Sequence, residues 1–382
     1  MHIVADQQIA FAVDYFSGLG EVHLVDGRKI SPDTVSQADI LLVRSVTPVD
    51  SGLLTKSRVK FVASATSGID HIDTGYLEKN GVGFAHAGGC NARSVAEYVL
   101  SCLLIWAEQR EVNLLEKKMG IIGHGHIGRI LHELLKIIGI NCLINDPPLK
   151  IETKHDFYCD LDEVLSADIL SLHVPYVSEG EYPTDNLVNR KFLDKVKDSV
   201  LLINTSRGEV IDESALIDFI GVNKGVSLVL DVWKNEPLIN INLLKEVCIG
   251  TPHIAGYSLD GKLNATRMLY IQACEFFGRD KSNVDVQTYS LTGTREFFPD
   301  INLDENELIK FAVLSHYDAR SDGAALKMML DLDNSQRGIY FDQLRKNYPV
   351  RREFPATRIH LNPNQSGIAE KLQALGFMVS VT

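Results

Sequence analysis

Three glycines between an apolar run and an amphipathic helical pattern constrain the fold of this chain more than any other feature. Gly123, Gly125 and Gly128 have the spacing Gly-x-Gly-x-x-Gly, with the apolar run 120–122 before them and a helical pattern at 127–138 after them. At such a turn the first glycine permits a tight bend, the second lets backbone N–H groups approach a pyrophosphate, and the third lets helix and strand pack closely. The segment therefore predicts a dinucleotide site between a strand and a helix.

The next apolar run, 142–145, is followed by an acidic residue that indicates which dinucleotide binds. Asp146 follows Gly128 by 18 residues, at the place where a carboxylate can accept hydrogen bonds from the adenine ribose diol. A 2′-phosphate would meet the carboxylate there, so the sequence favours NAD over NADP as the cofactor. The alternative is a purely structural turn with a solvated acid, but the strand, glycines, helix and acid together favour the cofactor site.

Short apolar runs alternate with helical patterns through most of the chain. They lie at residues 22–25, 40–43, 61–64, 82–85, 120–122, 142–145, 169–172, 200–203 and 228–230. Such runs, separated by crossover helices, are typical of buried strands in parallel, doubly wound sheets. Helices are expected over 92–108 and around 256–278, the second returning the chain to the first lobe, and from about 286 the alternation stops. We therefore predict an α/β fold with two doubly wound parallel-sheet lobes and a smaller C-terminal domain.

The charge and composition argue against several classes of function. A formal net charge of −12 over 382 residues argues against nucleic acid as a partner, because phosphate backbones require a basic face. The apolar stretches are too short to span a membrane, and the N-terminus has the pattern of a first strand rather than of a signal peptide. The 6 cysteines form no Cys-x-x-Cys pair and no cluster with zinc-ligand spacing. Reduced thiols, a cytoplasmic location and no metal are therefore expected.

Three polar residues that suit the oxidation of an alcohol each follow an apolar run of the second series. Arg207 follows 200–203, Glu236 follows 228–230, and His253 lies beyond the next run. A guanidinium at the carboxyl end of a strand can hold a substrate carboxylate through two hydrogen bonds. Histidine can accept the hydroxyl proton, and a neighbouring carboxylate would orient its ring and favour the charged form. Each residue alone suits an ordinary ion pair or a core histidine, but the three together predict a dehydrogenase site.

These segments resemble the D-isomer-specific 2-hydroxyacid dehydrogenase family. The resemblance rests on Gly89-Cys-Asn-Ala92, Asp146-Pro-Pro, the Arg207 segment, Trp233-Lys-Asn-Glu-Pro and Pro252-His-Ile-Ala-Gly-Tyr-Ser. It implies a flavodoxin-like substrate lobe (1–92 and 258–285), a Rossmann NAD domain (93–257) and a small α+β domain (286–382) that forms a homodimer. It also implies catalytic roles for Arg207, Glu236 and His253.

The resemblance further implies which residues contact the cofactor and the substrate. The implied NAD contacts are Gly123, Gly125, His126, Ile127, Gly128, Asp146, Val174, Ser206, Asp231 and Gly256. Val174 departs from the family, which usually reads His-Thr-Pro at this place, so a hydroxyl is missing and a weaker NAD contact is expected. The implied substrate contacts are Ser45, Thr66 and Tyr257, and a turn at Ser67-Gly68 can present backbone N–H groups to a carboxylate.

The C-terminal segment points to a phosphorylated substrate. Residues 341–354, with Tyr317-Asp-Ala-Arg upstream, resemble the tail of family members that oxidise 4-phospho-D-erythronate to 2-oxo-3-hydroxy-4-phosphobutanoate, on the route to pyridoxal phosphate. The cations available for the phosphate are Arg44, Arg93, Arg345, Lys346, Arg351 and Arg352. Two alternatives stay open: a dehydrogenase for another D-2-hydroxy acid, such as 3-phosphoglycerate, and a non-catalytic NAD-sensing protein.

Overall fold

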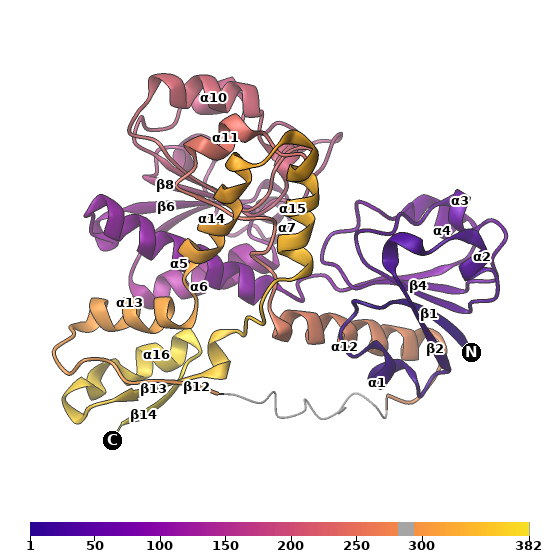
Figure 1. The fold of residues 1–382 in the computed structure, drawn as a ribbon. Coiled ribbons are helices and arrows are strands. Elements are labelled where there is room, and N and C mark those ends of the chain that lie inside the picture. Colours follow the sequence, from indigo (N-terminus) through magenta and orange to yellow (C-terminus); the bar gives the residue numbers. More distant parts are fainter. Residues whose placement is uncertain (282–293, 382) are drawn as a thin grey trace. The chain divides into compact units, whose positions relative to one another are not determined.

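The computed structural model describes residues 1–281 and 294–381, and the chain divides into two compact units (Figure 1). The first unit combines residues 1–91 with the segment that begins at Ser258, and the second combines residues 92–257 with the segment from Thr294. The predicted boundary between residues 285 and 286 lies outside the described residues. A separate C-terminal domain stays a prediction, because the residues from Thr294 group with the second unit.

The first unit contains a parallel sheet of five strands in the order β2-β1-β3-β4-β5, the order of flavodoxin-like folds. The strands are β1 (His2–Asp6), β2 (Glu21–Val25), β3 (Ile40–Val43), β4 (Phe61–Ser64) and β5 (Gly83–His86). The helices are α1 (Ala12–Phe16), η1 (Gly27–Lys29), α2 (Pro32–Val35), α3 (Ser51–Leu54), α4 (Thr74–Lys79) and α12 (Leu259–Phe276). Successive residues of a strand face opposite layers. Ile40 and Leu42 pack with α1 and α12, whereas Leu41 packs with α2, α3 and α4.

The second unit contains a parallel sheet of six strands in the order β11-β10-β9-β8-β6-β7. The strands are β6 (Lys118–Ile122), β7 (Asn141–Asn145), β8 (Ile169–Leu172), β9 (Leu201–Asn204), β10 (Ser227–Leu230) and β11 (Ile249–Gly250). Beyond β7, Tyr158 forms an isolated parallel bridge with Ile144, which adds the remnant of a further strand and completes the order of a Rossmann sheet. The strand order reverses between β6 and β8, and open α/β sheets bind ligands at the carboxyl ends of strands at such a point.

Helices cover both faces of this second sheet. They are α5 (Ala92–Arg110), η2 (Leu114–Glu116), α6 (His126–Ile138), α7 (Pro147–Thr153), α8 (Leu161–Val164), α9 (Arg190–Leu193), η3 (Gly208–Val210), α10 (Glu213–Val222) and α11 (Ile241–Glu246). Ile169 packs in the layer of α5 and α6, and Leu170 packs in the opposite layer with α9 and α10. Among the described helices, none combines the length and the apolar character that crossing a membrane requires.

The C-terminal tail, residues 294–381, adds helices and a three-stranded parallel sheet in the order β12-β13-β14 (Figure 1). Its elements are β12 (Arg295–Phe297), α13 (Glu305–His316), α14 (Ala319–Lys327), η4 (Met328–Asp331), α15 (Asn334–Lys346), η5 (Phe354–Ala356), β13 (Thr357–Leu361), η6 (Pro363–Ile368), α16 (Ala369–Leu375) and β14 (Met378–Val381). Val313 of α13, Ile359 of β13 and Leu372 of α16 belong to the same buried cluster as α5 and α6. The tail and the Rossmann sheet therefore share a core.

The predicted α/β fold and its strands are confirmed. β3, β4 and β8 coincide with the predicted runs, and α5 begins at Ala92 as expected and extends to Arg110. β6 begins at Lys118, two residues earlier than predicted, because Lys118 and Met119 pair with β7. Polar and flexible residues at a strand end can still pair within a sheet, and a hydrophobic run does not report that extension.

One buried histidine makes the stability of the second unit depend on pH. His173 follows β8, is 8% exposed, and shares hydrogen bonds with Ser171 at 2.8 Å and Thr205 at 3.3 Å. Burial lowers the pKa of His173 from 6.5 to about 3. Below pH 6.5 the unfolded chain takes up this proton while the folded protein does not, so stability present above pH 6.5 is lost as pH falls toward 3.

We therefore expect the free energy of unfolding to drop by about 2 kcal/mol through His173 between pH 7 and pH 5. The variant His173→Gln removes this contribution and should lose less stability over that interval, although it is less stable at pH 7. Denaturant unfolding followed by tryptophan fluorescence measures the second unit, because both tryptophans, Trp106 and Trp233, lie in it. The exposed His155 gives the control His155→Gln, whose pH dependence should match the parent protein. An unchanged dependence in His173→Gln would contradict the prediction.

Candidate active site

The glycine turn joins β6 to α6 and combines two close backbone contacts with one open position. Gly123 has φ +93°, and a Cβ there would lie 2.6 Å from the carbonyl oxygen of His173. A Cβ at Gly128 would lie 2.1 Å from the carbonyl oxygen of Gly123. A Cβ at Gly125 would have no neighbouring heavy atom of the described chain within 4 Å. A dinucleotide turn needs this pattern, in which the first and third glycines permit close packing and the second leaves room for a ligand.

Two further features of this turn suit a dinucleotide. Within the described residues no side chain caps the start of α6, after Gly125, so the first N–H groups of the helix are available to an anion. Asp146, after β7, accepts hydrogen bonds from the N–H groups of His124 at 2.8 Å and Leu149 at 3.1 Å. These bonds fix the carboxylate, and its remaining lone pairs can still accept a hydrogen bond from a ribose hydroxyl.

His253 and Glu236 form a hydrogen-bonded pair beyond the carboxyl ends of β10 and β11. Nδ1 of His253 lies 2.8 Å from Oε2 of Glu236, and Oε1 of Glu236 accepts a hydrogen bond from the N–H of Trp233 at 2.9 Å. Burial alone would raise the pKa of the Glu236 carboxyl, but His253, the Trp233 N–H and the charge of Arg345 together hold that pKa below its usual value. Glu236 is therefore ionised and able to stabilise a positive charge on the imidazole.

Asp231 connects the histidine segment to the sheet. Its Oδ1 accepts hydrogen bonds from the hydroxyl of Thr251 at 2.6 Å and the N–H of Ile254 at 2.8 Å, and its Oδ2 accepts one from the N–H of Ala255 at 3.0 Å. The backbone carbonyl of Asp231 accepts a hydrogen bond from the N–H of His253 at 2.7 Å. This carboxylate was predicted only as an NAD contact, and sequence reasoning missed that it organises the loop that carries the histidine.

The Arg207 loop packs directly on the loop that carries Glu236. A Cβ at Gly208 would lie 2.0 Å from the backbone carbonyl carbon of Trp233, so only glycine permits this approach. Nη1 of Arg207 donates to the carbonyl of Ser206 at 2.7 Å. The structure thus brings the loops after β9 and β10 together, and half-buried Arg207 belongs to the same edge of the sheet as the His253–Glu236 pair.

The other predicted NAD residues of the second unit also lie at the carboxyl ends of its strands. A Cβ at Gly123 would approach the backbone nitrogen of Val174 at 2.9 Å, so the residue that lacks the family hydroxyl still contacts the glycine turn through its backbone. The hydroxyl of Ser206 donates to Oδ1 of Asn204 at 2.7 Å. His126 and Ile127 form the first turn of α6, and Gly256 follows the segment that Asp231 holds.

Ser45 and Thr66, the predicted substrate contacts of the first unit, follow β3 and β4. Ser45 is exposed. The hydroxyl of Thr66 donates to the carbonyl of Gly68 at 2.7 Å and lies 2.6 Å from the hydroxyl of Ser64. Thr66 therefore closes its own turn, and the contact of both residues with a substrate stays a prediction.

The tail contacts the segment that follows His253. Nη2 of Arg345, in α15, donates to the hydroxyl of Tyr257 at 3.0 Å. Arg351 donates to the carbonyl oxygen of Ala255 and is buried. The ring of Tyr348 lies 5.9 Å from that of Tyr257 in an edge-to-face arrangement. The sequence identified the tail arginines as cations, but it gave no signal for their partners, which are about ninety residues away along the chain.

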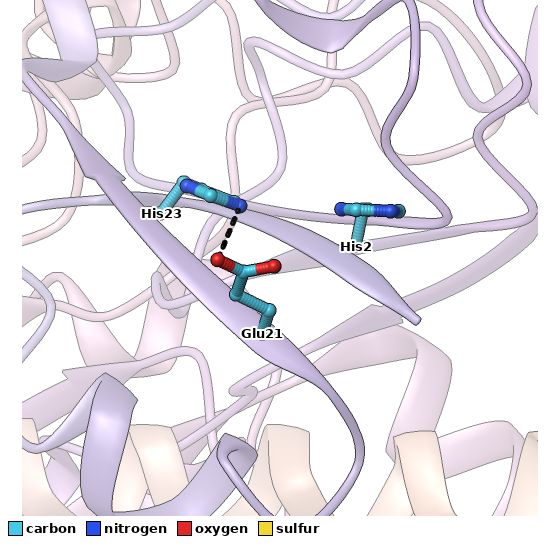
Figure 2. A group of neighbouring side chains, drawn as sticks. All are labelled: His2, Glu21 and His23. Carbon is cyan, nitrogen blue, oxygen red and sulfur yellow. Dashed lines mark ion pairs between the residues drawn. The ribbon is translucent and has the colours of Figure 1, made fainter.

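One group of side chains in the first unit has metal-ligand spacing (Figure 2). The ligand atoms of His2, Glu21 and His23 lie within 4.8 Å of one another, and all three residues are exposed. Nε2 of His23 lies 3.7 Å from Oε1 of Glu21. These residues stand on the neighbouring strands β1 and β2 and include none of the predicted catalytic residues, so the expectation that no metal takes part in the chemistry stays a prediction.

Two family models match the chain. Residues 104–255 match the D-isomer specific 2-hydroxyacid dehydrogenase NAD binding domain, and residues 297–376 match a domain of unknown function, DUF3410. Among solved structures, the D-lactate dehydrogenase from Aquifex aeolicus complexed with NAD and lactic acid has a TM-score of 0.61 and 26% identity, and covers 74% of this chain and 97% of its own. The NAD-bound 3-phosphoglycerate dehydrogenase of Entamoeba histolytica, at 22% identity and a TM-score of 0.63, shows the same fold over 75% of this chain and 98% of its own.

Full-length relatives have one name in common. The erythronate-4-phosphate dehydrogenase of Hahella chejuensis is 40% identical over 380 residues, and the match covers 100% of both chains. The enzyme of the same name from Marinobacter nauticus is 39% identical over 384 residues, again over 100% of both. The matched NAD binding domain and the D-lactate dehydrogenase complexed with NAD, together with the glycine turn, show that NAD is the cofactor. This chain therefore belongs to the erythronate-4-phosphate dehydrogenases, within the D-isomer-specific 2-hydroxyacid dehydrogenase family.

Proposed function

We propose that this chain oxidises 4-phospho-D-erythronate at C2 to 2-oxo-3-hydroxy-4-phosphobutanoate, with NAD as the hydride acceptor. The observation that carries the proposal is the 2.8 Å hydrogen bond between His253 and Glu236, which lies in the same edge region as Arg207 and the glycine turn. The substrate is the one for which the full-length relatives are named. The reaction would supply an intermediate on the route to pyridoxal phosphate.

The residues of the second unit fit the cofactor. The open position at Gly125 and the start of α6 suit a pyrophosphate, and the fixed carboxylate of Asp146 suits the ribose diol of NAD. The bound cofactor would accept a hydride on its nicotinamide. The proposed contacts are those implied by the sequence: Gly123, Gly125, His126, Ile127, Gly128, Asp146, Val174, Ser206, Asp231 and Gly256.

Three side chains would carry out the proton transfer and hold the substrate. His253 takes the proton of the C2 hydroxyl as the C2 hydrogen departs with its electron pair, so the alcohol carbon becomes a ketone. Glu236 stabilises the imidazolium that forms and fixes the ring through Nδ1, which leaves Nε2 for the substrate. Arg207 holds the C1 carboxylate and polarises the neighbouring carbon–oxygen bond.

Further substrate contacts, assembly and location complete the proposal. Ser45, Thr66 and Tyr257 are the proposed contacts with the substrate hydroxyls or phosphate, on the family resemblance. The tail is proposed to form a homodimer in the cytoplasm, with no nucleic acid or membrane as partner. The exposed apolar side chains Phe298, Ile301, Met328, Ile339 and Val350 of the tail support an interface there.

The experiment that tests the function is NADH formation with 4-phospho-D-erythronate, run beside 3-phosphoglycerate, D-lactate and D-glycerate. Strong preference for 4-phospho-D-erythronate is expected. Preference for another acid would overturn the substrate and leave the family assignment standing. No turnover of any acid by protein that binds NAD would favour a sensing role.

Removing either member of the His253–Glu236 pair should slow turnover strongly without abolishing cofactor binding. We expect His253→Asn to lower kcat about 10³-fold or more, because no base remains for the hydroxyl proton, and Glu236→Gln to lower it about 10²-fold. Glu236→Gln keeps an oxygen for the N–H of Trp233, but it loses the charge and replaces the oxygen that faces Nδ1 of His253 with an NH2 group. NAD affinity, measured by fluorescence quenching, should stay within a few fold of the parent. Loss of NAD binding in both variants would indicate a structural rather than a chemical role.

Substitutions at two of the glycines should separate cofactor binding from folding. Gly125→Ala meets open space, so its thermal stability should stay near that of the parent, while NAD affinity falls because the methyl group occupies the ligand's space. Gly128→Ala places Cβ 2.1 Å from a carbonyl oxygen, so both stability and NAD affinity should fall. Thermal melts and NAD titrations of the two variants make the comparison, and equal effects on stability would contradict it.

A further inference from the structure

Arg345 stands beside the reacting residues but belongs to the tail that matches a domain of unknown function. It lies near the end of α15. Its Nη2 donates to the hydroxyl of Tyr257 at 3.0 Å, and its guanidinium lies 5.6 Å from the centre of the Tyr257 ring. Its charge also reaches Glu236, the partner of His253. A contact between residues far apart in the sequence therefore places a cation of the tail near the His253–Glu236 pair.

The charge of Arg345 is not neutralised by an ion pair in the part of the chain that the structure describes. No described carboxylate lies within ion-pair distance of it, and its Nε is shielded from solvent without a hydrogen-bond partner. The residue as a whole is half-buried. Among the described residues the guanidinium donates to a neutral hydroxyl, lies over the ring of Tyr257 and forms no ion pair, and a partly desolvated cation in such surroundings is costly. An anionic ligand that accepts hydrogen bonds from the guanidinium would offset this cost.

The other cations proposed from the sequence have different surroundings. Arg44 forms an ion pair with Asp6 at 2.9 Å, and Arg93 forms one with Glu97 at 2.6 Å. Of the remaining candidates, Arg351 is buried against the carbonyl of Ala255, and Lys346 is exposed on the helix that carries Arg345. Arg352 is half-buried next to Arg351, and its backbone carbonyl lies 2.8 Å from Nε2 of His316.

We propose that Arg345, held by Tyr257, is the binding site for the phosphate group of the substrate. Arg207 would hold the C1 carboxylate and His253 the C2 hydroxyl, so the second anionic group of a four-carbon acid, on C4, needs a separate cation. The guanidinium offers two parallel N–H groups to phosphate oxygens, and the phenol of Tyr257 adds a neutral donor. The tail would then determine specificity for a phosphorylated acid. This inference rests on the proposed function, because it assigns a residue to that substrate's phosphate.

The test compares substrates that differ only in the phosphate. We would measure kcat/KM for 4-phospho-D-erythronate and for D-erythronate in the parent protein and in Arg345→Gln. The variant should lose about 10- to 100-fold on the phosphorylated acid, mainly through KM, and less than about twofold on D-erythronate. Arg345→Lys should recover part of the loss, since it restores charge without the paired N–H groups. Lys346→Gln, which removes the same charge from the next residue of α15, should match the parent on both acids.

Equal losses on both acids, or a shifted pH profile for both, would overturn the proposal and make Arg345 a positioning residue that acts through Tyr257 or Glu236. An unchanged preference for the phosphorylated acid would overturn it as well. Near-parent NAD affinity and melting temperature would show that Arg345→Gln is folded.

A binding measurement separates this inference from the proposed function. Calorimetric titration of the NAD-loaded protein with inorganic phosphate should give binding in the parent and in Lys346→Gln, and at least about tenfold weaker binding in Arg345→Gln. Phosphate binding that depends on Arg345, without turnover of 4-phospho-D-erythronate, would contradict the proposed function and support the proposed phosphate site. If the parent protein and Arg345→Gln turn over 4-phospho-D-erythronate equally well, the proposed function is supported and the proposed phosphate site is contradicted.

Discussion

A single buried carboxylate holds the segment that carries His253, the proposed catalytic base. Asp231 is 1% exposed and gathers the hydroxyl of Thr251 and the N–H groups of Ile254 and Ala255 around its two oxygens. His253 lies between these donors with φ +57°, a conformation that costs a non-glycine residue about 1–3 kcal/mol and persists only where surrounding contacts impose it. Because a buried carboxylate also needs donors, the same hydrogen bonds solvate Asp231 and hold His253 in the turn that meets Glu236.

The tail holds this segment from its carbonyl side. Arg351 donates to the carbonyl of Ala255, the residue whose N–H goes to Asp231, and its guanidinium lies 4.5 Å from the centre of the Tyr317 ring. The hydroxyl groups of Tyr317 and Tyr348 both donate to one oxygen of Asp322, each at 2.7 Å. Ala255 is thus held through its N–H by a carboxylate from the Rossmann sheet and through its carbonyl by a guanidinium from the tail. The tail therefore supports the geometry of the segment that carries His253, whatever its part in assembly.

The fold was predictable because its strands are buried on both faces, which produces unbroken apolar runs such as 40–43 and 169–172 in any parallel sheet of this kind. His253 and Glu236 were predictable for a related reason, since polar residues that directly follow parallel strands meet at one edge. The contacts of Asp231 with Ile254 and of Arg345 with Tyr257 were not, because these partners are set by tertiary packing across 23 and 88 residues. Sequence patterns report local periodicity and residue chemistry, and neither specifies which distant donor meets which acceptor.

The size of the shared fold explains why such a cation would come from the tail. The D-lactate dehydrogenase that resembles this chain is matched over 97% of its own length but over only 74% of this one. About a quarter of this chain therefore lies beyond what that enzyme, complexed with NAD and lactic acid, contains. Lactic acid carries one anionic group, whereas 4-phospho-D-erythronate carries two. A guanidinium on α15 adds a positive charge at this edge through its hydrogen bond to Tyr257, while the hydrogen bonds that join Asp231, Glu236 and His253 to their partners are made by other groups.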